Sequence, residues 1–134
     1  MAADDERYED GPILVVDDDE HLREALAKIL EHEGHTVLQA ADGPTAVRMT
    51  MEHRPDLLVL DYMMPGMNGE MVLGELQREL HEDTPPALLL TATLEPVERA
   101  SRMGAVEGLE KPFNVPELVA AVARHRRRLK SQQS

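Results

Sequence analysis

The chain has 134 residues, 42% of them hydrophobic, no cysteine and a formal net charge of −12. This length fits one domain with a single core, and the missing cysteines exclude disulfides and thiolate metal sites. No apolar run is long enough to span a bilayer, and the acidic start lacks the basic and apolar parts of a signal peptide, so we expect a cytoplasmic protein without membrane contact. The negative charge repels phosphate backbones, so we expect protein partners rather than nucleic acid.

Short apolar runs alternate along the chain with segments of helical periodicity. Strands are expected at 13–16, 35–39, 57–60, 87–90 and 106–109. Helices are expected at 22–30, 43–53, 67–80, 95–103 and from the N-cap Asn114 to Leu129. Gly34 can end the first of these helices, and Pro116 and Glu117 suit the first turn of the last. Alternating units of this kind predict a doubly wound α/β fold, in which helices cover both faces of a parallel sheet.

Ligands bind such sheets beyond the carboxyl ends of the strands, and those ends carry polar residues in this sequence. The residues are Asp17, Asp18, Asp61 and Thr91, with Lys111 after the last strand. If the first and third strands are neighbours, a spacing of roughly 4.8 Å brings the carboxylates into one cluster. Ligation by oxygen alone suits Mg²⁺ better than zinc. A carboxylate beside Mg²⁺ and a lysine can attack phosphorus and form an aspartyl phosphate.

The strings at these strand ends are ILVVDDD, LLVLDYMMPGMNG, LLLTAT and GLEKPF. In this order they resemble the receiver domain of bacterial response regulators, which act in two-component signalling. The resemblance covers residues 12–128, between an acidic extension at 1–11 and a polar tail at 129–134. It implies a flavodoxin-like (βα)5 fold with a five-stranded sheet in the order 2-1-3-4-5. Because only a short polar end follows, we expect a stand-alone receiver that is a monomer or a phosphorylation-dependent dimer.

Carried over position by position, the resemblance makes Asp61 the phosphoacceptor, which takes its phosphoryl group from a histidine kinase or a phosphotransfer protein. The implied Mg²⁺ ligands are Asp17, Asp18, Asp61 and the backbone carbonyl of Met63. The implied phosphate-binding groups are those of Met63, Thr91, Ala92 and Lys111. Thr91 and Lys111 would also assist the transfer itself.

Three further features of the resemblance concern the region around Lys111. A cis peptide bond to Pro112 is implied. The family usually has Tyr or Phe three residues before this lysine, where the chain has Gly108. The stretch from Thr91 to Lys111 is also short by about two residues, which should trim the fourth loop or helix. We therefore expect intact chemistry with an altered readout.

Three classes of function are compatible with these residues. The first is a signalling switch that catalyses only its own phosphorylation and dephosphorylation and passes the signal to an unknown protein by direct contact. The second is a pseudo-receiver that only binds protein, an alternative that Gly108 keeps open. The third is an aspartate-nucleophile phosphohydrolase, which is disfavoured because Met63 stands where such an enzyme needs a second acid.

Methionines and a basic tail complete the sequence features. The internal methionines, including Met63, Met64, Met67 and Met71, are interpreted as core filler. Met63 is also expected to face the phosphoryl group and to give it a long lifetime, because a thioether holds water poorly; Thr93 is the alternative control of that lifetime. The bases at 124–130 are interpreted as complements to a helix dipole rather than as a nucleic-acid site.

Overall fold

The computed structural model describes residues 11–92 and 96–126 of the chain. Within this part, five strands alternate with five α-helices. The strands are β1 (Ile13–Val16), β2 (Val37–Ala40), β3 (Leu57–Asp61), β4 (Ala87–Thr91) and β5 (Glu107–Glu110). The helices are α2 (Glu20–His32), α3 (Gly43–His53), α4 (Gly69–Leu80), α5 (Pro96–Met103) and α6 (Val115–His125), and a short 3-10 helix η1 (His81–Asp83) follows α4.

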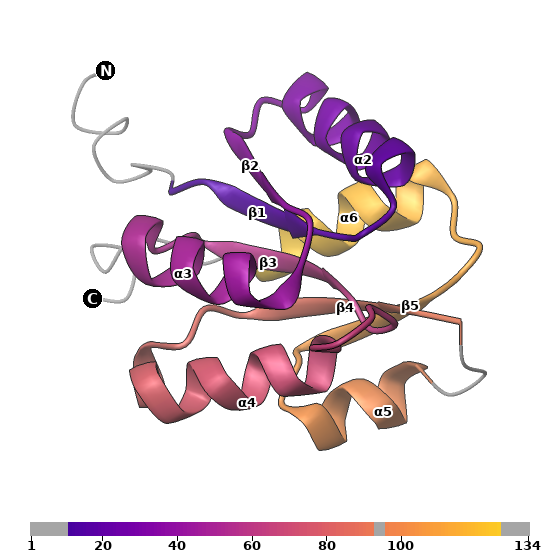
Figure 1. Ribbon diagram of the computed structural model, residues 1–134. Helices are drawn as coiled ribbons and strands as arrows, with labels where there is room; N and C mark the ends of the chain where they lie inside the picture. The colour runs from indigo at the N-terminus through magenta and orange to yellow at the C-terminus, as the bar shows by residue number, and fades with distance from the viewer. Residues whose placement is uncertain (1–10, 93–95, 127–134) are drawn as a thin grey trace, which may run out of the picture.

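All neighbouring strands of the sheet run parallel, in the order β2-β1-β3-β4-β5 (Figure 1). This confirms the predicted doubly wound fold and the strand order that the family resemblance implied. Strand β2 lies on one side of β1, and the next strand in the chain, β3, lies on the other side of β1. Ligands of doubly wound sheets bind where the strand order reverses in this way, so the carboxyl ends of β1 and β3 mark the place to search.

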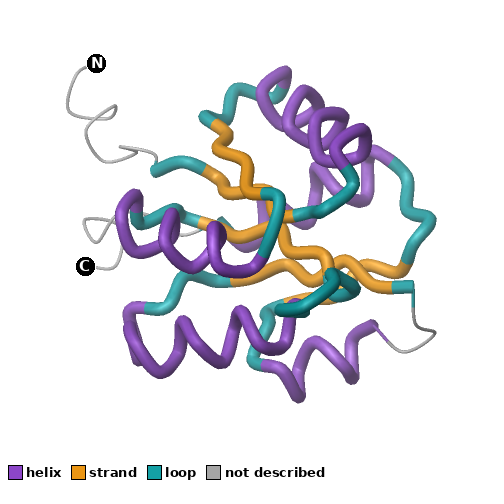
Figure 2. Tube along the Cα trace, viewed as in Figure 1, coloured by secondary structure: helices purple, strands orange, loops and turns teal. Residues whose placement is uncertain are grey.

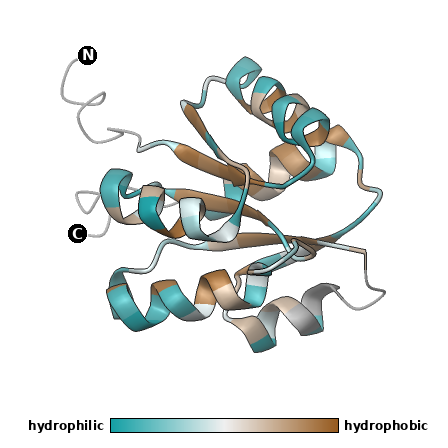
Figure 3. Cartoon of the chain, viewed as in Figure 1, coloured by the Kyte–Doolittle hydropathy of each residue, from teal (hydrophilic) through white to brown (hydrophobic). Residues whose placement is uncertain are grey.

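The sheet lies between two layers of helices (Figure 2). Leu14, Val16, Leu58 and Leu60 pack with buried residues of α3, α4 and α5. The alternate residues Ile13, Val15, Leu57 and Val59 pack with buried residues of α2 and α6. Because successive side chains of a strand point to opposite faces, strands that are apolar throughout need both layers. Figure 3 shows the consequence, with hydrophobic strands in the middle and hydrophilic outer surfaces on the helices.

Local hydrogen bonds explain where helix and strand boundaries differ from those expected. The helix expected from residue 67 begins at Gly69, because the Asn68 side chain accepts the N–H of Met71 as an N-cap. The strand expected from His35 begins at Val37, because the N–H of His35 still bonds the carbonyl of Leu30 at the end of α2. Strand β5 is shifted by one residue, to Glu107–Glu110.

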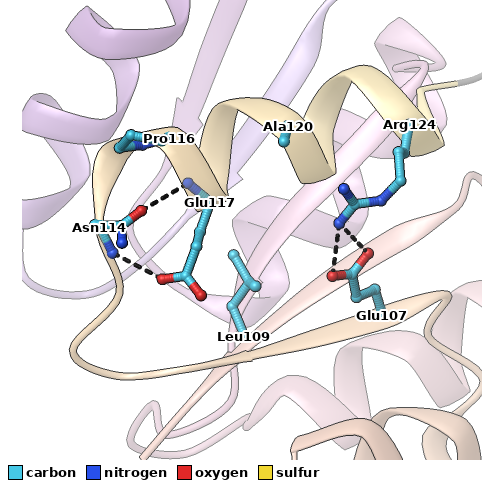
Figure 4. Close-up of a pocket in the computed structure, with 7 residues that line it drawn as sticks. All are labelled: Glu107, Leu109, Asn114, Pro116, Glu117, Ala120 and Arg124. Atoms are coloured by element: carbon cyan, nitrogen blue, oxygen red, sulfur yellow. Dashed lines mark hydrogen bonds and ion pairs between the residues drawn. The ribbon is translucent and has the colours of Figure 1, made fainter.

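The last helix begins as predicted. Asn114 and Glu117 form a reciprocal capping box, in which each side chain accepts the backbone N–H of the other (Figure 4). The prediction that this helix continues to Leu129 is wrong, because α6 ends at His125 and the C-cap Arg126 has an extended backbone. Residues 1–10 of the extension, Thr93 and the polar tail lie outside the described residues. The domain boundaries at 12 and 128 therefore stay a prediction. In the described part, none of the helices is long and apolar enough to cross a membrane.

The interpretation of the methionines as core filler is wrong for several of them. Met64 and Met103 are buried. Met63, Met71 and Met51 are exposed, at 65%, 51% and 37% of their surface. Met51 and Met71 lie in helices α3 and α4, on positions outside the apolar stripes that those helices turn toward the sheet.

Candidate functional site

Three carboxylates meet at the carboxyl ends of β1 and β3. Val16 and Leu60 are paired across these strands, so the residues that follow them, Asp17 and Asp61, lie at the same level of the sheet. Asp17, Asp18 and Asp61 each offer one oxygen, and these oxygens lie within 4.8 Å of one another. Asp17 and Asp61 are buried while Asp18 is exposed. The cluster predicted from the sequence is therefore present and is open on one side.

The turn after β1 holds Asp17 in a fixed orientation. Its N–H bonds the carbonyl of Ala40 on β2 at 3.2 Å, and its Oδ1 accepts the N–H of Asp19 at 2.9 Å. Asp19 in turn caps helix α2 by accepting the N–H of Leu22. The other oxygen, Asp17 Oδ2, is buried without a hydrogen-bond partner in the described structure. A buried, unmatched carboxylate oxygen beside two further carboxylates fits a hard divalent cation with oxygen ligands.

Burial and mutual repulsion perturb the acids of this cluster. Burial raises the pKa of Asp17 above its ordinary value, the charge of Asp61 raises it further, and the N–H of Asp19 lowers it in part. Burial also raises the pKa of Asp61, against the opposing hydrogen bond from Lys111. Both groups thus hold a proton more tightly than a solvated aspartate does. A cation between them would remove that penalty.

Lys111 supplies the positive charge of the site. Its Nζ donates to Asp61 Oδ1 at 2.8 Å, and its side chain is 29% exposed against 4% for that of Asp61. The N–H of Lys111 bonds the carbonyl of Thr91 at 2.7 Å, which fastens the residue to the end of β4. The peptide bond to Pro112 is cis, as the resemblance implied.

The remaining predicted residues lie at the same edge of the sheet. Thr91 is buried at the end of β4, next to the strand that carries Asp61, and Ala92 follows it and is exposed. The backbone N–H of Met63 lowers the pKa of the Asp61 carboxylate in part. Every site residue expected from the sequence thus lies at the carboxyl ends of the strands, around Asp61.

Two residues of the site region were missed by the sequence analysis. Arg23 of α2 donates from Nη1 to the carbonyl of Asp17 at 3.0 Å and from Nε to Oε1 of Gln39 at 3.1 Å. The contact depends on β2 lying beside β1, so the local sequence carries no signal for it. Gly69 lies so close to the loop after β3 that a Cβ there would meet the Tyr62 Cα at 3.0 Å and the Asp61 carbonyl at 3.1 Å. Its place in the string MNG was the available signal.

Gly108 occupies the middle of β5. It is buried and pairs with Leu89 of β4. The family position that usually carries an aromatic ring is therefore filled by a residue with no side chain inside a regular strand. Any change at the site must reach the surface of the molecule without that ring.

Comparison with known proteins identifies the class to which this fold and site belong. The family model of the response regulator receiver domain matches residues 13–123. The chain belongs to this family and is the receiver domain of a response regulator of two-component signalling.

Among characterised relatives, the response regulator MprA of Mycobacterium ulcerans is 44% identical over 120 residues, which are 88% of this chain and 51% of that protein. MprA of Mycobacterium avium is 43% identical over 122 residues, covering 90% of this chain and 53% of that protein. The chain thus spans about half the length of the curated relatives that it matches.

Solved structures agree with this assignment. The chemotaxis protein CheY4 of Vibrio cholerae has a TM-score of 0.79 at 29% identity, over 87% of this chain and 98% of that one. The response regulator TrrA of Thermotoga maritima, solved in complex with Mg²⁺ and BeF, has a TM-score of 0.75 at 34% identity, over 85% of this chain and 97% of that one.

Proposed function

We propose that the protein is a phosphorylation-dependent switch in which Asp61 accepts a phosphoryl group from a histidine kinase or a phosphotransfer protein. The observation that carries this proposal is the setting of Asp61. Its carboxylate is buried at the end of β3, bonded to Lys111 Nζ at 2.8 Å, and its oxygen lies within 4.8 Å of those of Asp17 and Asp18. A nucleophilic carboxylate, a lysine and a pair of further acids are the parts that transfer to an aspartate requires.

The proposed transfer is a displacement at phosphorus. A carboxylate oxygen of Asp61 forms the new P–O bond while the P–N bond to the donor histidine breaks. Lys111 changes partner, from the free carboxylate to the oxygens of the arriving group. The Thr91 hydroxyl and the N–H of Ala92 are the further donors that we assign to those oxygens, because both residues follow β4 at the same edge. Fixed donors of this kind act without reorganisation during the reaction.

We assign Mg²⁺ to the acid cluster. The carboxylates of Asp17, Asp18 and Asp61 and the carbonyl of Met63 would hold the ion, and the orphaned Asp17 Oδ2 supports this assignment. When bound, Mg²⁺ neutralises negative charge on the transferring oxygens. The complex of the relative TrrA with Mg²⁺ and BeF supports the same choice of ion.

Gly108 favours one competing function, a pseudo-receiver that binds its partner irrespective of phosphorylation. The buried position in β5 offers no ring whose rotation could report the state of the site. No contact of the described residues favours the phosphohydrolase, since Met63 brings no second acid. The partner and the cytoplasmic location stay predictions.

Intact-mass measurement after incubation with acetyl phosphate and Mg²⁺ tests the proposed nucleophile. The wild type should gain one phosphoryl group and Asp61→Asn none, because an amide is a poor nucleophile. Asp83→Asn is the matched control, an equal change at an exposed residue of η1 remote from the site. A full-rate adduct on Asp61→Asn would remove Asp61 from its proposed role.

A further inference from the structure

Met63 is the most exposed methionine of the described residues. Its exposure is 65%, whereas that of the adjacent Met64 is 6% and that of Met103 is 7%. Oxidation of a thioether to the sulfoxide requires that the oxidant reach the sulfur, so access decides which methionines react first. The next most exposed, Met71 at 51%, lies in α4 and takes no part in the site.

Met63 also lies close in the chain to the proposed phosphoacceptor Asp61. The residue follows Asp61 by two positions, just beyond the end of β3 where the acid cluster lies, and its backbone N–H lowers the pKa of the Asp61 carboxylate. Its backbone thus lies next to the group that we propose to be phosphorylated, while its side chain is exposed to solvent. Oxidation of this side chain therefore changes an exposed group two residues from the proposed phosphoacceptor.

We propose that Met63 is an oxidation site through which hydroperoxides shorten the lifetime of the phosphorylated state. The sulfur attacks one peroxide oxygen, the O–O bond breaks, and an S=O bond forms while water or an alcohol leaves. The sulfur is oxidised by two electrons and the peroxide is reduced by the same two. The lifetime effect rests on the function proposed above, because it presupposes a phosphorylated Asp61.

A change in polarity connects the oxidation to the lifetime. A thioether is a weak acceptor of hydrogen bonds, so the unmodified side chain does not hold a water molecule well. The sulfoxide oxygen is a strong acceptor, and oxidation turns an apolar side chain into a polar one. Hydrolysis of an aspartyl phosphate needs a water placed in line with phosphorus, which a polar neighbour can hold. We therefore expect the oxidised protein to lose its phosphoryl group several-fold faster.

The first half of the test follows the oxidation itself. The full chain is treated with limiting hydrogen peroxide, and the masses of its peptides are measured by mass spectrometry. Met63 should gain oxygen before Met71, and both should gain it before the buried Met64 and Met103. Oxidation of a buried methionine ahead of Met63 would overturn the proposal.

The second half measures dephosphorylation in excess Mg²⁺, with and without peroxide, for the wild type, Met63→Leu and Met71→Leu. Peroxide should speed phosphate loss several-fold in the wild type and in Met71→Leu, but not in Met63→Leu. Methionine sulfoxide reductase should restore the slow rate, and Met63→Asn should be fast without peroxide. Equal acceleration in Met63→Leu, or none in the wild type, would overturn the oxidation proposal alone. An untreated wild type that takes up no phosphoryl group would instead overturn the proposed function and, with it, the lifetime effect.

Discussion

At the scale of single residues, Arg23 holds the turn on which the acid cluster depends. Its guanidinium donates to the carbonyl of Asp17 and to the side chain of Gln39, and so spans β1 and β2. The two effects of this side chain on a bound cation oppose each other. Its hydrogen bonds fix the carboxylate geometry, while its positive charge repels the ion. The charge faces water and salt, which weaken it, so we expect the positioning effect to dominate.

Arg23→Ala should therefore lower the affinity for Mg²⁺, by about fivefold, which is the loss of about 1 kcal/mol that one such hydrogen bond contributes. Calorimetric titration of the folded protein with Mg²⁺ measures this directly. Lys28→Ala, at an exposed position of the same helix, is the control for charge alone. Tighter binding of Mg²⁺ by Arg23→Ala would show that repulsion, and not positioning, is the main effect of Arg23.

At the scale of secondary-structure elements, an ionic contact fastens the end of α6 to the edge strand β5. Arg124 donates to both oxygens of Glu107 at 2.9 Å, and His125 Nε2 lies 2.7 Å from Oε1 (Figure 4 shows the arginine pair). Burial raises the pKa of Glu107, but the hydrogen bonds and charges of Arg124 and His125 outweigh it, so this pKa lies below its usual value of 4.5. The folded state therefore favours the ionised carboxylate.

Because the pKa of Glu107 is lowered in the folded state, ionisation of this carboxyl stabilises the fold. The contact stabilises the fold above the ordinary pKa of 4.5, and its contribution disappears as the pH falls through the lower pKa of the folded state. Glu107→Gln should cost about 1 kcal/mol or less at neutral pH, since Arg124 is partly exposed, and nothing at a pH well below 4.5. Urea unfolding at both pH values tests this, with Glu79→Gln on the exposed side of α4 as control. An equal cost at both pH values would contradict the ionic origin.

The positions of the strands and helices, and the contacts between them, differ in how well the sequence predicts them. Apolar runs such as 57–60 predicted strands because a parallel strand is buried on both faces, and Asn114 predicted a helix start because its cap is local. The start of α4 was misplaced because the same kind of local signal, the N-cap Asn68, was not used. The contact of Arg23 with Gln39 could not be found, because it depends on which strands become neighbours. Local signals were thus sufficient for the acid cluster, and contacts across elements were not.

At the scale of the whole molecule, Arg126 connects the end of α6 to the residues at the amino ends of the strands. The site lies at the other ends of these strands. Arg126 donates to Asp56 Oδ2 at 2.9 Å, to the carbonyl of Gly11 at 3.3 Å and to His35 Nδ1 at 2.8 Å. The side chains of Arg126 and Asp56 are only 9% and 16% exposed. The residues before β1, β2 and β3 are thereby joined to the last helix.

Removing one partner of a buried ion pair leaves the other charge without compensation, which costs about 3–5 kcal/mol. Arg126→Ala should therefore lower the free energy of unfolding by an amount near the lower end of that range, because Asp56 keeps the N–H of Gly11 as a donor. Urea unfolding measures the change, and Arg48→Ala at an exposed position of α3 serves as control. A loss no larger than that of the control would mean that the network contributes nothing to stability.

We expect phosphorylation of Asp61 to change a surface that another protein can recognise. Two-dimensional amide NMR spectra of the Mg²⁺-bound protein, before and after addition of acetyl phosphate, test it most directly. We predict shifts at Asp61, Thr91 and Ala92 that extend through α5, with smaller changes in β5, because Gly108 provides no ring that could rotate. Spectra that stay unchanged, or shifts confined to the residues around the phosphoryl group, would contradict the switch and favour a pseudo-receiver.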